Sequence, residues 1–295
     1  MRIGLRYVVT LFLLGVFIGT MVHHVIERCR NKTETTPSNS MSFPNFANKY
    51  KHSAILTPEV SLERKREVGR YPDSKPPRTI ILCYDKRFMQ SVLDKYNCEQ
   101  CDGYFSNVFF FKDYPSVAIA EFGWFSPINS MGLELVIAWG VKQIIAIGSA
   151  CGIQKDIKPG DILICDKAIR DEGASHHYLP SSKYVDSSKN LQNKIVAEMN
   201  QESILYRLGT TWTTDVFFRA TTEEVKHYQG EGVMCIEGEA SAVLSVAKFR
   251  KVDMAVMLTI TDSYANLKWE NAIDYQAKKN ETFFKMLDIA LKASV

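Results

Sequence analysis

Residues 233–247, VMCIEGEASAVLSVA, join a short β-prone run to an apolar helix. The four residues before Glu237 are apolar, and the apolar residues after Glu239 recur at the spacing of a helix face. Two carboxylates therefore lie at a strand-to-helix corner, close to the positive end of the helix dipole. Such a corner at the edge of an α/β sheet is where ligands usually bind. The two acids could hold neighbouring hydroxyls of a ligand, or they could only cap the helix.

Strand and helix signals alternate around this corner. The expected strands are 79–84, 104–111, 117–122, 143–147, 161–165, 204–212, 233–236 and 253–261. The expected helices are 86–96, 133–139, 191–199, 240–247 and 269–290. This alternation predicts an α/β fold, a three-layer αβα sandwich with a central mixed sheet.

The N-terminal part of the chain differs from this domain. Residues 7–26 carry no formal charge and are long enough to span a bilayer as a helix. The small-x-small pattern of a cleavage site is poor, which favours an uncleaved signal anchor over a cleaved signal peptide that would release a secreted protein. Arginines flank both ends, so the side of the membrane stays open. We expect an anchor at 1–30, a stalk and lead-in at 31–77, and a domain at 78–295.

Composition excludes several classes of protein. The net charge of +3 is too small to indicate a nucleic-acid partner, and a 46% hydrophobic content suffices for a large core. The seven cysteines are an odd number and do not suggest a disulfide scaffold. Cys98 and Cys101 form a CxxC pair, but no second pair or histidine follows at zinc spacing, so no metal site is predicted.

Polar groups follow several of the expected strands, where the carboxyl ends of a sheet bind ligands. Residues 148–152 (GSACG) form an expected Gly-rich turn, in which Ser149 adds a hydroxyl. Phe217 lies among polar residues and could stack on a planar base or pack in the core. Asp262 ends a nearly all-apolar strand, where we expect burial to favour its protonated form and suit it to proton donation.

Six motifs in register resemble the nucleoside phosphorylase family, which includes uridine phosphorylase and hexameric purine nucleoside phosphorylase. They are 146–152 (AIGSACG), 158–161 (KPGD), 169–175 (IRDEGAS), 214–218 (TDVFF), 237–241 (EGEAS) and 261–262 (TD). The resemblance covers about residues 78–290, and it indicates a divergent, membrane-anchored member.

The resemblance implies that phosphate attacks C1′ of a purine or pyrimidine ribonucleoside and releases the base and ribose-1-phosphate. Glu239 would bind the ribose 2′- and 3′-hydroxyls, and Asp262 would protonate the departing base; these are the two catalytic candidates. The other substrate-binding candidates are Gly148, Ser149, Phe217, Glu237, Arg170 and Arg219. Phosphate would be the co-substrate, with no cofactor, and Ser149 and Arg87 are candidates for binding it.

The resemblance also implies a homo-oligomer, either a dimer or a hexamer. His52 is a candidate for reaching the ribose in a neighbouring subunit, because the family uses an N-terminal histidine in that way. A membrane anchor on each subunit would constrain the packing of such an oligomer.

The chain departs from the family pattern mainly around the anion site. Tyr84 and Asp85 stand where the family has a Gly-Asp-Pro turn, Ala146 replaces an arginine, and residues 122–126 (FGWFS) replace a Gly-rich turn. Gly238 replaces a methionine that packs on ribose, which predicts a looser sugar pocket. A nucleosidase that uses water, or a catalytically weakened nucleoside-binding or storage protein, therefore stand as alternatives.

Overall fold

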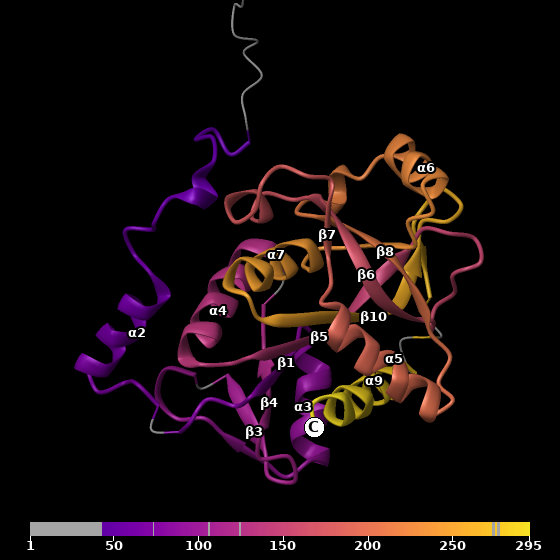
Figure 1. Ribbon diagram of the computed structural model, residues 1–295. Helices are drawn as coiled ribbons and strands as arrows, with labels where there is room; N and C mark the ends of the chain where they lie inside the picture. The colour runs from indigo at the N-terminus through magenta and orange to yellow at the C-terminus, as the bar shows by residue number, and fades with distance from the viewer. Residues whose placement is uncertain (1–42, 73, 106, 124, 273–274, 276–277) are drawn as a thin grey trace, which may run out of the picture. The chain divides into compact units, whose positions relative to one another are not determined.

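The computed structural model describes residues 43–72, 74–105, 107–123, 125–272, 275 and 278–295. Residues 48–295 form one unit, whose course is shown in Figure 1. The predicted membrane segment, residues 7–26, lies outside the described residues. No helix in the described part of the chain combines the length and the apolar character needed to cross a bilayer.

The described strands belong to one mixed sheet. They are β1 (Thr79–Cys83), β2 (Cys98–Gln100), β3 (Val108–Phe111), β4 (Val117–Glu121), β5 (Gln143–Gly152), β6 (Ile162–Asp171), β7 (Tyr184–Asp186), β8 (Arg207–Thr214), β9 (Cys235–Glu237), β10 (Asp253–Ser263) and β11 (Glu270–Asn271). The described helices are α2 (Pro58–Glu67), α3 (Lys86–Lys95), α4 (Ser126–Trp139), α5 (Lys189–Gln201), α6 (Thr222–Gly230), α7 (Ala240–Arg250) and α9 (Lys279–Ala293). Single 3-10 turns are η1 (Lys49–Lys51), η2 (Gly103–Phe105), η3 (Ser175–His177) and η4 (Phe217–Arg219).

The sheet closes on itself at one end. Strand β5 pairs in parallel with β1 and with β10, and β10 pairs antiparallel with β6. From β6 the ladder continues in parallel to β8 and β9, and β9 returns antiparallel to β5. Five strands therefore form a closed ring beside the open part of the sheet. The α/β class and the mixed sheet are confirmed; the ring is an additional feature.

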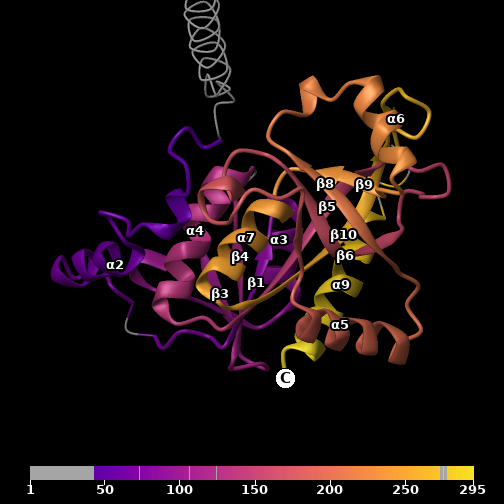
Figure 2. The ribbon, with the colours of Figure 1, turned by 45° about the horizontal axis from the view of Figure 1, so that its top comes forward.

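Helices cover both faces of the sheet. Helices α4 and α7 lie side by side on one face, and α5 and α9 lie together on the other with α3 (Figures 1 and 2). Ile80 of β1 packs on the α4 side and Ile81 on the α9 side, and both are fully buried. Burial of such a side chain contributes about 1.5–3 kcal/mol. Because both faces are covered, the central strands read as continuous apolar runs rather than alternating ones.

Helix α2 precedes residue 78, where the sequence suggested that the domain begins. The side chain of Leu62 in this helix is buried in the core on the α4 side of the sheet. The helix is capped by Thr57, whose hydroxyl accepts a hydrogen bond from the N–H of Val60. Part of the lead-in is thus packed against the domain.

Two local predictions that bear on the site were wrong. Residues 148–152 are not a turn but the second half of β5, because β10 continues to pair with them up to Gly152. The last helix starts at Lys279 rather than at residue 269, since β11 pairs antiparallel with Asp262 and Ser263 of β10. In both places a tertiary strand pairing outweighs the local pattern.

Candidate active site

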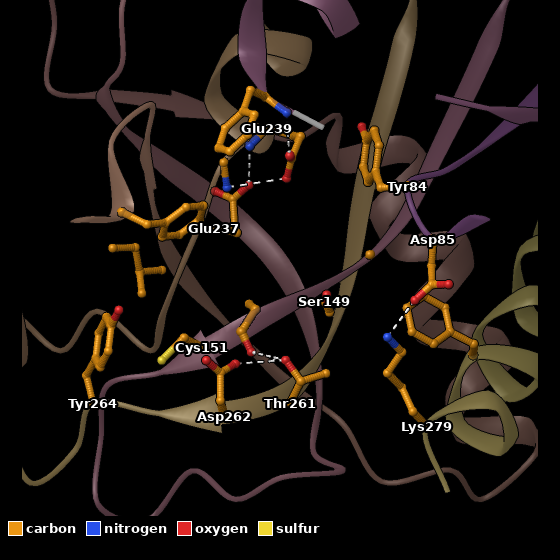
Figure 3. A pocket seen from close by; sticks show the side chains of 17 residues that line it. Tyr84, Asp85, Ser149, Cys151, Glu237, Glu239, Thr261, Asp262, Tyr264 and Lys279 are labelled. Atoms are coloured by element: carbon orange, nitrogen blue, oxygen red, sulfur yellow. Dashed lines mark hydrogen bonds and ion pairs between the residues drawn. The ribbon is translucent and has the colours of Figure 1, made fainter. Parts of the chain in front are cut away.

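The ends of strands β1, β5, β9 and β10 meet around one cavity of about 420 Å³ (Figure 3). Six of the residues singled out in the sequence line it: Gly148, Ser149, Phe217, Glu237, Glu239 and Asp262. Further lining residues were not predicted as site residues, among them Tyr84, Asp85, Phe125, Cys151, Thr261, Tyr264 and Lys279. The cavity therefore unites segments that are more than a hundred residues apart in the chain.

Strand pairing explains how these residues meet. Cys83 of β1 pairs with Ile147 of β5, so the residues after Cys83 lie beside Gly148 and Ser149. On the other side of β5, Asp262 of β10 pairs with Cys151 across an irregularity at Thr261. A bulge re-aims side chains, and here Thr261 and Asp262 both line the cavity although they are consecutive.

Glu237 is buried, with 2% of its surface exposed, and its carboxylate is fully engaged. Oε1 accepts hydrogen bonds from the hydroxyls of Thr213 at 2.5 Å and Thr211 at 3.3 Å. Oε2 accepts from the N–H groups of Glu239 and Ala240, both at 2.7 Å. Burial, and then the nearby charge of Glu239, raise the pKa of Glu237 despite these donors. Glu237 thus caps α7 and ties it to β8, which matches the capping interpretation of the sequence.

Glu239 has a different environment, because its side chain faces the cavity. Oε1 accepts a hydrogen bond from the N–H of Phe125 at 2.9 Å, and Oε2 accepts from the N–H of Gly238 at 3.3 Å. Burial raises the pKa of Glu239 above its usual range. A carboxylate held from the backbone and open to a cavity is able to accept bonds from ligand hydroxyls.

The segment around Phe125 holds this corner from the opposite side. Phe125 has φ 73°, a region that residues with a side chain rarely adopt, and this turn aims its N–H at Glu239. The hydroxyl of Ser126 donates to the carbonyl of Gly238 at 2.7 Å. The rings of Phe125 and Phe217 lie 3.5 Å from where a Cβ on Gly238 would stand. The two aromatic rings therefore border the space beside Gly238 at van der Waals distance, and the looser sugar pocket stays a prediction.

Asp262 points into the cavity from a different side than Glu239 (Figure 3). It is half-buried rather than buried, which corrects the expectation from its apolar strand. Oδ1 accepts from the hydroxyl of Thr261 at 2.8 Å, and Oδ2 accepts from the indole N–H of Trp269 at 2.7 Å. These two bonds fix the orientation of the carboxyl group. The adjacent Cys151 stays a thiol, because burial and the charge of Asp262 raise its pKa far above the usual value.

A third part of the cavity carries an ion pair that the sequence did not predict. Nζ of Lys279, the first residue of α9, lies 2.5 Å from Oδ2 of Asp85. Oδ1 of Asp85 accepts from the N–H groups of Arg87 and Phe88, both at 2.9 Å, and so caps α3. Burial opposes ionisation of Asp85, but the bond from Lys279 and the backbone donors outweigh it and lower the pKa of this carboxyl. The capping position of Asp85 was visible in the sequence, whereas Lys279 fell inside the helix expected at 269–290.

The three arginine candidates are placed outside this cavity. Arg170 is buried, and its guanidinium donates to the hydroxyls of Ser175 and Ser182 and to the carbonyls of Ser175 and Pro180 at 2.7–3.0 Å. Arg219 is exposed at the end of η4, and Arg87 is exposed in the first turn of α3. The structure gives Arg170 a structural position and brings neither Arg219 nor Arg87 to the cavity. His52 lines a separate hollow in the same chain.

Arg170→Met is expected to lower the free energy of unfolding by roughly 2–5 kcal/mol, because several buried acceptors lose their donor. KM for substrate in the folded fraction should stay within about twofold, since Arg170 is not among the described residues that line the cavity. Urea unfolding and steady-state kinetics measure the two effects. A variant that is as stable as the wild type but has a raised KM would instead indicate that Arg170 binds the substrate.

The fold therefore places acidic side chains around one cavity at the ends of its strands, an arrangement suited to a small polar ligand. The sequence pattern of the Phosphorylase superfamily matches residues 117–292, so the chain belongs to this superfamily. Purine nucleoside phosphorylase of the DeoD type from Bacillus cytotoxicus is 29% identical over 163 residues, 55% of this chain and 68% of that protein. The corresponding protein of Bacillus cereus is 28% identical over the same shares of both chains.

The fold is also similar to that of a solved phosphorylase structure. The crystal structure of uridine phosphorylase from Vibrio fischeri superposes with a TM-score of 0.62 and 21% identity. The superposition covers 75% of this chain and 92% of that structure. At this identity the likeness concerns the fold alone.

Proposed function

We propose that this protein cleaves the N-glycosidic bond of a purine or pyrimidine ribonucleoside with phosphate, giving the free base and ribose-1-phosphate. The observation that carries the proposal is the placement of Glu239 and Asp262 on different sides of one cavity, with Phe217 in the same lining. The names of the curated relatives, purine nucleoside phosphorylases, support it. A purine ribonucleoside is therefore the first substrate to test.

The chemistry assigns a role to each group. Glu239 would accept hydrogen bonds from the 2′- and 3′-hydroxyls, and these strengthen as positive charge develops on the ribose. An oxygen of phosphate forms a bond to C1′ while the bond from C1′ to the base nitrogen breaks. The electron pair of that bond leaves with the base, and Asp262, after taking up a proton from solvent, would donate this proton to the base. Phe217 would stack on the base and keep it oriented.

Hydrolysis is the second candidate, and one observation favours it. Ala146 is fully buried in β5 and offers a methyl group where the family pattern has an arginine. An arginine binds phosphate through two strong, charge-assisted hydrogen bonds. The absence of an arginine at this position therefore weakens the binding of a phosphate anion more than the binding of a water molecule. Phosphate is proposed as co-substrate, and no cofactor is invoked for either reaction.

A product assay on the full-length chain separates these functions. The protein is incubated with a panel of ribonucleosides, with and without phosphate, and the products are separated by chromatography. Phosphate-dependent ribose-1-phosphate supports phosphorolysis, and free ribose without phosphate identifies a nucleosidase. Saturable nucleoside binding without turnover would leave a binding or storage protein.

Residues 7–26 are proposed to anchor the chain as a single-pass membrane protein, and the folded unit is proposed to form a homo-oligomer. Resistance to alkaline extraction from membranes tests the anchor, and N-terminal sequencing shows whether a signal peptide has been removed. The mass of the protein in detergent tests for a dimer or a hexamer.

The pH profile is expected to report Glu239. The ionised carboxylate is the form that accepts two hydroxyl bonds, and burial raises its pKa. As pH falls, Glu239 is therefore protonated earlier than an ordinary glutamate, and kcat/KM should drop on the acid side by about tenfold per pH unit. Because Glu237 and Glu239 interact, the limb reports the pair. The test compares the pH dependence of kcat/KM in the wild type and in Glu239→Gln. If the acid limb is unchanged in the variant, the limb belongs to another group.

A further inference from the structure

We propose that Lys279 binds the attacking phosphate and that Asp85 holds its ammonium group in position for this purpose. The proposal rests on the phosphorolysis proposed above and identifies the acceptor part of the same cavity. No sequence motif pointed to Lys279, because it lies inside the helix that was expected at 269–290 rather than at the start of a helix.

The charges of the cavity make a cation necessary. The described lining contains four carboxylates, those of Asp85, Glu237, Glu239 and Asp262, and Lys279 is the cationic side chain among the described lining residues. A phosphate dianion is repelled by like charges in a partly desolvated site unless a positive group is close. Lys279 is 19% exposed and thus sheltered from solvent without being closed off from the cavity.

Lys279 is also held at the part of the cavity that suits a nucleophile. The alignment of β1 with β5 places Asp85 near Ser149, and Figure 3 shows Ser149 between this ion pair and Asp262. Ser149 is exposed in the cavity and offers a hydroxyl donor. Phosphate bound by Lys279 and Ser149 would therefore approach C1′ from one side, while the base departs toward Asp262 on another. In-line displacement needs this separation of attacking and leaving groups.

Asp85 acts as a fixed anchor for the lysine rather than as a competitor that must be displaced. Its Oδ1 is committed to the cap of α3 and its Oδ2 to Lys279, so the carboxylate cannot rotate freely. An ammonium group has three donors, and the contact with Asp85 uses one of them. Phosphate oxygens can take a further donor without breaking the ion pair.

Lys279→Met in the full-length protein tests the proposal by steady-state kinetics at varied phosphate. KM for phosphate should rise by about tenfold or more, as expected for loss of a charge-assisted bond, while KM for the nucleoside stays within about twofold. Lys279→Arg should restore most of the phosphate affinity. The matched control is Lys285→Met on the same helix, where an exposed lysine pairs with Glu281 outside the cavity; its KM for phosphate should be that of the wild type.

Loss of the ion pair could also disturb the fold, so a second variant and a second measurement are needed. Asp85→Asn with Lys279→Met removes both charges together, and thermal unfolding with and without inorganic phosphate reports binding without turnover. Phosphate should raise the Tm of the wild type and of Lys285→Met but not of the double variant. Equal stabilisation of all three proteins, or none of the wild type, would overturn the role of Lys279. Free ribose from the wild type without phosphate would instead overturn phosphorolysis, whatever the Tm values.

Discussion

Asp262→Asn is expected to lower kcat by about 100- to 10,000-fold, the range for loss of a general acid. Nucleoside affinity should change by less than about threefold, because the amide keeps the shape of the carboxyl group: its oxygen can accept the bond from Trp269, and its NH2 group can donate to the hydroxyl oxygen of Thr261. Single-turnover rates and equilibrium nucleoside binding separate the two quantities. The large effect thus falls on the chemical step alone.

Two further variants make this result specific. Trp269→Phe keeps the carboxyl group but removes the donor to Oδ2, so its loss of kcat should be much smaller than that of Asp262→Asn. Asp253→Asn makes the same change at the other end of β10, where the carboxylate accepts a bond from Ser188, and its kcat should match the wild type. An Asp262→Asn variant that lost affinity and kcat equally would not support proton donation by Asp262.

Glu239→Gln is expected to lower kcat/KM for a ribonucleoside by about 30- to 1,000-fold, because two charge-assisted bonds to ribose become neutral ones. The loss should be smaller for the 2′-deoxyribonucleoside, which lacks one of the two hydroxyls. Comparing both substrates with both proteins isolates the contact to the 2′-hydroxyl. An equal loss for the two substrates would separate Glu239 from that hydroxyl.

Glu237→Gln provides the contrast at the same corner. Its carboxylate accepts four hydrogen bonds, two of them from the backbone N–H groups of Glu239 and Ala240. In the glutamine variant an NH2 group can replace the oxygen that accepts these two bonds, and neither an NH2 group nor a backbone N–H can accept a hydrogen bond. The free energy of unfolding should fall by about 2–4 kcal/mol, while kcat/KM of the folded protein changes little. Urea unfolding and kinetics on the same preparation test this division between the two acids.

The sequence predicted the parts of this fold in which local pattern and tertiary environment agree. Strand β1 is buried at every position because helices cover both faces of the sheet, and its limits were predicted to within one residue. The corner between β9 and α7 was predicted for the same reason. Glu239 and Asp262 could be singled out because Glu239 lies two residues after β9 and Asp262 lies in the last two residues of β10.

The remaining parts of the site depend on contacts between distant segments. Lys279 reaches the cavity only because β11 pairs with β10 and delays the start of α9. Arg170 stood in a family-like motif, yet its neighbours in the 175–182 loop bind every edge of its guanidinium. In the sequence, a charged residue that binds a ligand looks the same as one that binds a loop of its own chain. Only the pairing of strands and loops in space separates the two.

The ring formed by β5, β10, β6, β8 and β9 also has a dynamic consequence. Each of these strands has hydrogen-bonded neighbours on both sides, so none can detach without disrupting two ladders at once. Backbone amides around Glu237 and Asp262 should therefore exchange with solvent only through large-scale unfolding. The strand ends then act as a rigid frame, and the motions that admit and release ligand are left to the connecting segments that carry Phe125, Phe217 and Trp269.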